Sequence, residues 1–160
     1  MTPIDWGDLF DAGPFVGALL TEDPRHAEAL PLVEAARQGQ IMACTTSAII
    51  SEVYSALTWH MAVPRHTPAE AKRSIYRLLE PPSMIKILPD NLTVAIKSLE
   101  IAAAHNLTAR RSHDARHAAA ALVAGVTRVY TYDVEDWKLF AAEGLTIIGP
   151  VSSLKLLAHN

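Results

Sequence analysis

Cysteine is nearly absent from this chain of 160 residues, which contains only Cys44. A single cysteine excludes an internal disulfide, and without a grid of cysteines and histidines a structural zinc site is not expected. Cys44 falls in a predicted strand, where we expect a buried, inert thiol rather than a nucleophile. Half of the residues are apolar, so a chain of this length can bury a core without covalent cross-links. It fits one domain over residues 1–160.

Long hydrophobic runs and an excess of basic charge are also missing. The longest strongly apolar stretch, 118–126, is far short of the roughly 18–20 residues that a membrane-spanning helix needs. The first residues contain no basic segment followed by an apolar run, so we expect a cytoplasmic protein with no membrane association. The formal net charge is −3. This charge excludes a globally basic nucleic-acid-binding protein but permits a local basic patch beside an acidic pocket.

Short apolar segments rich in β-branched residues alternate with longer segments of helical periodicity. This order predicts an α/β protein with three layers, in which helices flank a central, mostly parallel, five-stranded sheet. The predicted strands are 9–11, 41–45, 85–88, 128–131 and 146–148. No flexible linker divides the chain into two parts.

Helix boundaries are marked by capping residues, prolines and glycines. Asp23 and Pro24 begin one predicted helix, Gly39 follows its end, and Pro31 is expected to kink or interrupt it. Thr67 and Glu70 form a capping box with a proline at the first helical position. Further helices are predicted at 48–61, 92–105, 113–124 and 134–142, with Ser47, Asn91, Ser112 and Asp133 as possible N-caps.

Four acidic residues occupy positions where a solvated charge is not expected. Glu52 lies beside the apolar stripe of its predicted helix, and Asp114 lies in a first turn below buried alanines. Asp11 and Asp133 follow predicted strands, at the edge of the sheet where ligands bind in α/β proteins. Taken singly, Asp114 is an ordinary first-turn acid, Asp133 an N-cap and Asp11 a turn residue.

Together, these four carboxylates are more informative. At mutual distances near 5 Å they would repel one another by roughly 20 kcal/mol in total at an effective dielectric constant of ~20. Such a group must take up protons or hold cations. Oxygen ligands without cysteine favour Mg²⁺ or Mn²⁺ over zinc.

The segments around these acids resemble a known family over nearly the whole chain. The matching segments are 10–19 (FDAGPFVGAL), 45–53 (TTSAIISEV), 112–115 (SHDA) and 131–137 (TYDVEDW). In order and spacing they are similar to the motifs of PIN-domain ribonucleases, in particular the small single-domain toxins of VapBC toxin–antitoxin pairs. The chain departs from that pattern at Ala12 and Gly13, where the family usually has threonine or serine and then asparagine. With Ala12 and Gly13, the chain lacks a hydroxyl that could support a metal-bound water. This absence affects the expected metal affinity and reaction rate more than the expected fold.

The resemblance implies a PIN-like fold and a Mg²⁺- or Mn²⁺-dependent endoribonuclease that hydrolyses RNA with a metal-activated water. It implies that Asp11, Glu52 and Asp114 hold one or two cations and that Asp133, with Asp136 as the alternate, is the fourth acid. Water as nucleophile would leave 5′-phosphate and 3′-hydroxyl ends. The implied partners are the RNA substrate, a small antitoxin that covers the pocket and a second copy in a homodimer.

Basic and aromatic residues near the acids suggest how RNA is held. Arg110, Arg111 and Arg116 surround Asp114 in sequence and are the predicted RNA-binding residues. The second basic set, on a separate predicted helix, is interpreted as a solvated face; it comprises Lys72, Arg73 and Arg77.

Two further pairs of side chains leave alternatives open. Trp59 and Trp137 could stack on bases, but we expect them to pack in the core. His113 and His117 lie four residues apart in one predicted helix. A structural place at the surface or helix start is preferred to a role beside the metal or substrate.

Two other functions are alternatives to the nuclease. A haloacid-dehalogenase-like phosphatase would have a second aspartate two residues after Asp11, and this chain has Gly13 there. The remaining alternative is a catalytically weak PIN-like module that binds RNA or protein. Ala12 and Gly13 are the features that support it.

Overall fold

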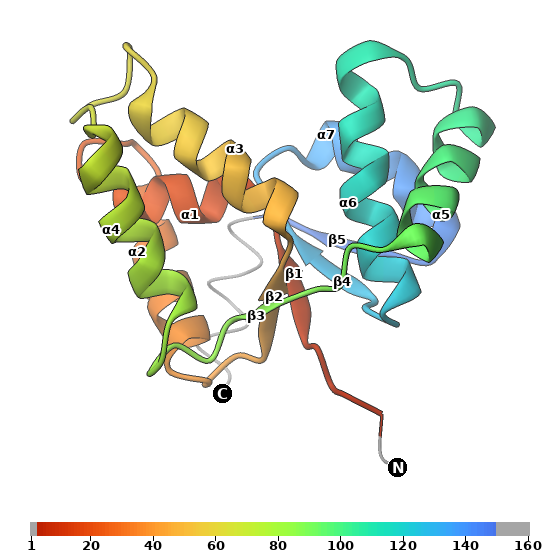
Figure 1. Ribbon diagram of the computed structural model, residues 1–160, viewed down its shortest axis with the longest axis horizontal. Coiled ribbons are helices and arrows are strands. Elements are labelled where there is room, and N and C mark those ends of the chain that lie inside the picture. Colours follow the sequence, from red (N-terminus) through yellow and green to blue (C-terminus); the bar gives the residue numbers. More distant parts are fainter. Residues whose placement is uncertain (1–2, 150–160) are drawn as a thin grey trace.

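A parallel five-stranded sheet forms the centre of the protein in a computed structural model that describes residues 3–149 (Figure 1). All neighbouring strands run parallel, in the order β3-β2-β1-β4-β5. The elements are, in chain order, β1 (Asp8–Phe10), α1 (Ala12–Leu19), α2 (His26–Arg37), β2 (Ala43–Thr45), α3 (Ser47–Thr58), α4 (Pro68–Leu79), β3 (Lys86–Ile87), α5 (Leu92–Ala104), the 3₁₀ helix η1 (Ala109–Arg111), α6 (Ser112–Val123), β4 (Arg128–Tyr130), α7 (Val134–Trp137), the 3₁₀ helix η2 (Lys138–Glu143) and β5 (Thr146–Ile148).

The strand order creates a switch point beside β1. The chain moves outward from β1 to β2 and β3, then crosses back so that β4 pairs with the other side of β1. Helices α1 to α4 lie on one side of the sheet and α5 and α6 on the other (Figure 1). In open α/β sheets, ligands bind at such a point, outside the carboxyl ends of the strands. The residues that follow β1 and β4 therefore lie where a ligand is expected to bind.

One continuous apolar core holds the two helical layers to the sheet. Phe10 of β1 is in ring contact with Phe15 of α1 and with Tyr130 of β4. On the other side, α6 turns a face of buried alanines inward and packs closely against α5. Small side chains let helix backbones approach one another, which fixes the position of residues at the start of α6.

The predicted sheet is confirmed, and each of the five predicted strands corresponds to one of β1 to β5. The capping box is also confirmed: Thr67 Oγ1 accepts from the Glu70 N–H, and Glu70 Oε2 accepts from the Thr67 N–H. Asn91 caps α5 as expected, by accepting from the Val94 N–H.

Several helix predictions need correction. No helix was predicted at α1, which begins directly after Asp11. Pro31 does not interrupt α2, because it is exposed together with Ala27, whose unpaired carbonyl water can reach. The predicted helix 134–142 is a short α7 followed by the 3₁₀ helix η2.

The predicted N-caps also differ in part. Thr46 rather than Ser47 caps α3, since its hydroxyl accepts from the Ile49 N–H. Ser112 is the first residue of α6 rather than its cap, because η1 leads directly into that helix. Asp133 holds the N-cap position of α7, but its side chain makes no capping bond.

The sequence predicts no membrane-spanning helix and a buried, inert thiol at Cys44. No helix within residues 3–149 is long and apolar enough to cross a membrane. Cys44 is fully buried in β2, and burial raises the pKa of its thiol to about 12. The thiol is therefore protonated and unreactive at neutral pH.

Candidate active site

Asp11 is the most deeply buried acid of the predicted site. It follows β1 directly, its backbone N–H continues the sheet by donating to the Tyr130 carbonyl, and only 5% of the residue is exposed. Its Oδ2 accepts from the Thr131 hydroxyl at 2.7 Å and from the Trp137 indole N–H at 3.1 Å. Both donors therefore hold the same carboxylate oxygen.

The charge of Asp11 is not balanced by an arginine or a lysine of the described chain, although His117 lowers its pKa electrostatically. No arginine or lysine among the described residues forms an ion pair with it. Burial raises the pKa of Asp11, while the hydrogen bonds from Thr131 and the Ala12 backbone lower it. A buried carboxylate held by neutral donors suits a site that gains its positive charge from a bound cation.

Glu52 approaches Asp11 from α3, the helix that follows the neighbouring strand β2. The buried residues Ile49, Val53 and Leu57 form the apolar stripe predicted for this helix. Glu52 was expected to point inward beside them, but 45% of its side chain is exposed. Its Oε1 lies 2.7 Å from Nε2 of His117. Glu52 is therefore a surface carboxylate held by a buried imidazole.

Asp114 lies in the first turn of α6 and is half-buried. Burial raises its pKa to about 6, and the negative charge of Asp11 contributes in the same direction, followed by those of Asp136 and Glu52. His117 lowers this pKa. A carboxyl group that other carboxylates make harder to ionise indicates that several predicted acids share one site.

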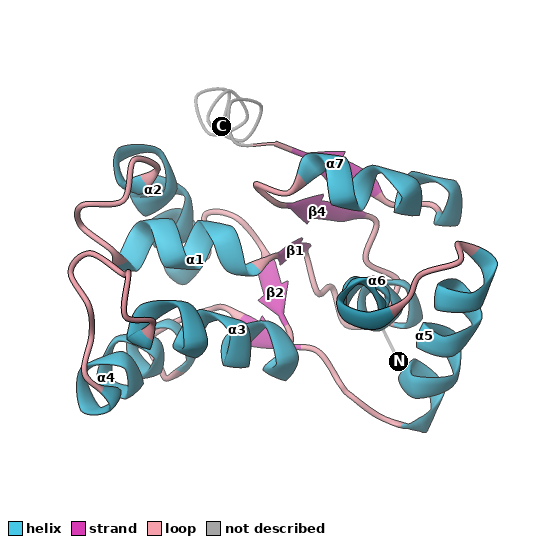
Figure 2. Ribbon diagram, turned by 90° about the horizontal axis from the view of Figure 1, so that it is seen from above, coloured by secondary structure: helices cyan, strands magenta, loops and turns pink. Residues whose placement is uncertain are grey.

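The separations allow these residues to hold one cation. One ligand atom from each of Asp11, Glu52 and His117 lies within 4.8 Å of the other two. Asp11 directly precedes α1, Glu52 lies on α3 and His117 on α6. Seen from above, the beginnings of α1 and α3 lie across from α6 (Figure 2). The structure thus unites Asp11 and Glu52 directly and brings Asp114 within electrostatic range of both.

The two candidates for the fourth acid are placed differently. Both Asp133 and Asp136 are exposed. The charge of Asp136 raises the pKa of Asp114, whereas the charge of Asp133 acts on Arg25. The backbone N–H of Asp133 donates to Thr131 Oγ1, so this residue helps to position the hydroxyl that holds Asp11.

The predicted RNA-binding arginines are exposed around the start of α6. Arg116 pairs with Asp90 at 2.6 Å, and Arg111 donates to the backbone carbonyl of Asp136 at 3.3 Å. Arg110 forms no ion pair with the rest of the described chain. Arg116 also lines a groove of about 330 Å³ with Glu52, His117 and His113.

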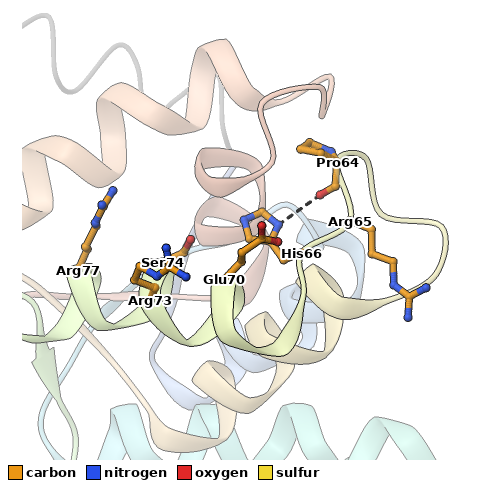
Figure 3. A pocket seen from close by; sticks show the side chains of 7 residues that line it. All are labelled: Pro64, Arg65, His66, Glu70, Arg73, Ser74 and Arg77. Atoms are coloured by element: carbon orange, nitrogen blue, oxygen red, sulfur yellow. Dashed lines mark hydrogen bonds between the residues drawn. The ribbon is translucent and has the colours of Figure 1, made fainter.

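A separate basic pocket of about 370 Å³ lies at the start of α4 (Figure 3). Arg73 and Arg77 of the second basic set line it, together with Arg65, His66 and Glu70. Figure 3 shows Arg65 and Arg77 extending away from the centre of this pocket. Lys72 lies instead over the ring of Tyr76. None of the predicted acids lines the pocket.

The departure at Gly13 has a structural counterpart. A Cβ atom at Gly13 would lie 2.9 Å from Cδ2 of Tyr132 and 3.3 Å from Nη1 of Arg25. Arg25 packs over the Tyr132 ring and pairs with Asp23. These side chains fill the space that a larger residue would need, so glycine here is part of a consistent local packing.

Two residues of the site were not predicted. His117 was treated as a partner of His113, but Asp114 and His117 lie three residues apart, which places them on one helix face. That spacing was the available signal. Trp137 was expected in the core and is buried, yet its N–H reaches Asp11 across 126 positions of sequence, which no local pattern could reveal. The same expectation for Trp59 is wrong, since 57% of it is exposed.

Solved structures with a similar fold include three from bacteria. VapC20 of Mycobacterium tuberculosis, a toxin that cleaves the sarcin-ricin loop, matches with a TM-score of 0.62 and 16% identity, covering 86% of this chain and 95% of that one. VapBC2 of Rickettsia felis, bound to a promoter DNA fragment, matches with a TM-score of 0.57 and 12% identity, covering 88% and 96%. FitAcB of Neisseria gonorrhoeae gives 0.57 and 16%, covering 89% and 97%.

Sequence comparison identifies the family. No curated protein matches the chain. The family model for the PIN domain, however, matches residues 9–141, which include β4 and the predicted acids Asp11, Glu52, Asp114, Asp133 and Asp136. The chain belongs to the PIN domain family.

Proposed function

We propose that this protein is a divalent-metal-dependent endoribonuclease that acts as the toxin of a VapBC-type toxin–antitoxin pair. The observation that carries the proposal is the meeting of Asp11 and Glu52 beside His117, with Asp114 within electrostatic range and no arginine or lysine of the described chain paired with Asp11. The PIN domain match and the fold shared with VapC20, a toxin that cleaves the sarcin-ricin loop, support it.

The residues present fit Mg²⁺ or Mn²⁺. Asp11 would offer Oδ1, because Thr131 and Trp137 occupy Oδ2. Glu52 and Asp114 would supply the other carboxylate oxygens. When bound, such a cation supplies Lewis acidity toward the phosphate and activates a water molecule as nucleophile. The chain's own contribution is to bring Asp11 and Glu52 together and to keep Asp114 within electrostatic range of both.

For the fourth acid we favour Asp136 over Asp133. The charge of Asp136 acts on Asp114, whereas that of Asp133 acts on Arg25. Asp136 would add negative charge at the rim nearest α6. Asp133 would act by orienting Thr131 through its backbone N–H.

We assign the RNA contacts to the arginines around α6. Arg110 and Arg111 lie on η1, next to Asp114 in sequence, and Arg116 lines the groove that contains Glu52. In this position their guanidinium groups would hold backbone phosphates that approach the acidic site. Exchange of Arg110 for glutamine should weaken RNA binding and reduce its dependence on salt.

The proposal extends to assembly and location. We propose that residues 1–160 form one PIN-like domain, that a cognate antitoxin covers the acidic site and that the toxin is a homodimer in the cytoplasm. VapBC2, which shares the fold, is described bound to promoter DNA. Light scattering measures the dimer, and co-expression with the antitoxin should suppress cleavage.

The decisive test uses purified protein and a labelled structured RNA. We expect cleavage in Mg²⁺ or Mn²⁺, none in excess chelator, and 5′-phosphate products. Glu52→Gln and Asp114→Asn should remove cleavage while the thermal unfolding temperature without metal stays the same or rises. Full activity in chelator would refute the metal-dependent nuclease. Tight RNA binding without cleavage in either metal would favour the catalytically weak binding module instead.

A further inference from the structure

His117 is a buried histidine in contact with the acidic site. Only 2% of its side chain is exposed, and its Nε2 lies 2.7 Å from Glu52 Oε1. A histidine at this position has two possible roles. It is either a nitrogen ligand of the cation, or a hydrogen-bond donor that holds Glu52.

The other ring nitrogen distinguishes the two roles. Nδ1 of His117 is buried and has no hydrogen-bond partner within residues 3–149. A histidine that binds a metal through Nε2 must carry its proton on Nδ1, and such a proton is almost always donated to a carboxylate, carbonyl or water. Here it would be a buried, unpaired N–H, which proteins avoid more strictly than an unpaired acceptor.

The opposite tautomer satisfies the surroundings. With the proton on Nε2, the imidazole donates to Glu52, and Nδ1 carries only a lone pair. Coordination through Nδ1 is excluded as well, because that atom has no contact with solvent from which a hydrated cation could enter. The surroundings of both ring nitrogens therefore fit a histidine that donates from Nε2. They do not fit coordination of a cation through either nitrogen.

Glu52 needs such a donor because little else restrains it. Nearly half of its side chain is exposed in the groove. The guanidinium that lines the same groove, Arg116, is bound to Asp90 at 2.6 Å. An imidazole N–H also differs from a guanidinium in effect. It directs the carboxylate through a single donor, whereas arginine presents a fork of five donors with a permanent charge.

We infer that His117 is a positioning residue that fixes Glu52 by donating its Nε2–H, and that it is not a ligand of the cation. The inference rests on the proposed function, in which Glu52 binds a divalent metal. It sets apart an all-oxygen ligand group, Asp11, Glu52 and Asp114, from a buried nitrogen donor behind it. An all-oxygen group suits Mg²⁺ and Mn²⁺, whereas a nitrogen ligand would shift preference toward zinc or nickel.

The first experiment reads the tautomer directly. ¹⁵N NMR of the metal-free protein should show His117 protonated at Nε2 and unprotonated at Nδ1. Comparison with His117→Gln assigns the resonance. Protonation at Nδ1 would overturn the inference, and this measurement requires neither metal nor a destabilising variant.

The second experiment reads the ligand group. Pulsed electron paramagnetic resonance of the protein loaded with Mn²⁺ should show no directly bound ¹⁴N. Calorimetry should give His117→Gln, which keeps an N–H donor, nearly the wild-type affinity for Mn²⁺, and His117→Leu an affinity about ten- to a hundredfold weaker. The matched control is His113→Gln, one turn earlier on the exposed side of the same groove, with unchanged affinity.

The outcomes separate the inference from the proposed function. A bound ¹⁴N signal that disappears in His117→Gln, or an equal loss of affinity in the glutamine and leucine variants, would make His117 a ligand and overturn the inference alone. A Glu52→Gln variant with wild-type Mn²⁺ affinity would refute the proposed metal site. In that case the NMR tautomer still decides whether His117 donates to Glu52.

Discussion

Strand β1 has a carboxylate near each end, and the two have opposite surroundings. Asp8 is its first residue and Asp11 follows its last. Burial is the largest cause that raises the pKa of each carboxyl group. Arg128, at the start of β4, lies 3.7 Å from Asp8 and lowers the pKa of that carboxyl. At the other end, the same pair of strands leads to Thr131 and Trp137, which hold Asp11 without a charge.

The difference separates an acid that pairs within the protein from one to which the proposed function assigns a cation. At the amino end of the sheet, the protein supplies its own cation, so the carboxylate needs nothing from solution. At the carboxyl end it supplies only neutral donors, and two further acids, Glu52 and Asp114, add negative charge. In the proposed function, this electrostatic cost is accepted at the carboxyl end because an external cation binds there.

Asp11→Asn should give the largest effect. Loss of this carboxylate should remove RNA cleavage and weaken Mn²⁺ binding at least about a hundredfold, because loss of an outer partner alone costs ten- to a hundredfold. Without metal, thermal unfolding should not occur at a lower temperature, since the variant removes a buried charge with no basic partner. Cleavage gels, calorimetry and thermal denaturation in chelator test each part. Retained cleavage would place the reaction elsewhere.

Acidification should act chiefly through Asp114. Burial and then the charge of Asp11 raise its pKa from 3.8 to about 6. Between these values the folded, metal-free protein binds a proton that the unfolded chain has released. The free energy of unfolding therefore falls as pH rises through this window, and this contribution to stability is gone above about pH 6. Mn²⁺ affinity should change in the opposite direction and rise over the same range, because protons compete with the cation.

Asp114→Asn is the matching variant for this prediction. Its free energy of unfolding without metal should depend less steeply on pH between about 4 and 6. Part of the slope should remain, since the raised pKa of Asp11 acts with the same sign. Denaturant unfolding at several pH values measures both slopes. An unchanged slope would show that Asp114 does not carry the raised pKa.

A smaller effect is expected for Trp137→Phe, which keeps an aromatic ring and removes the N–H that donates to Asp11. Mn²⁺ affinity should fall by about tenfold, at the lower end for outer partners, because Thr131 still holds the same oxygen. The smaller ring should also cost about 1–3 kcal/mol of stability. Trp59→Phe is the control, because Trp59 is exposed and should change neither quantity. An unchanged affinity in both variants would reduce Trp137 to a packing residue.

The contrast between the ends of β1 was only partly predictable from sequence. Local patterns located the strands and the acids, because alternating apolar runs and first-turn carboxylates are short-range signals. They did not locate α1, where Gly13, Pro14 and Gly17 look unlike a helix interior. The missing Cβ of Gly17 allows α2 to approach closely, since an added one would lie 3.0 Å from Cβ of Ala29. That tertiary contact compensates for a weak local propensity.

Burial was the least predictable property of the site. Glu52 was expected inside and lies half exposed, while Asp11, which alone could be read as a turn residue, is almost fully buried. The apolar periodicity of α3 places Glu52 next to the buried stripe, but it does not say whether the carboxylate points into the core or to the surface. The burial of Asp11 depends on Thr131 and Trp137, which are more than a hundred positions away. These contacts form because β4 pairs with β1, and local sequence patterns do not predict which strands pair.

Asp8→Asn should have the smallest effect, and it tests the comparison most directly. The pair with Arg128 is long, at 3.7 Å, and 39% of the arginine and 19% of the aspartate side chain are exposed. Such pairs contribute about 0–1 kcal/mol, so stability should change by no more than that, and RNA cleavage and Mn²⁺ affinity should stay as in the wild type. Calorimetry on Asp8→Asn and Asp11→Asn side by side provides the measurement. If both variants lost Mn²⁺ affinity equally, the arginine at one end and its absence at the other would not be what separates the two carboxylates.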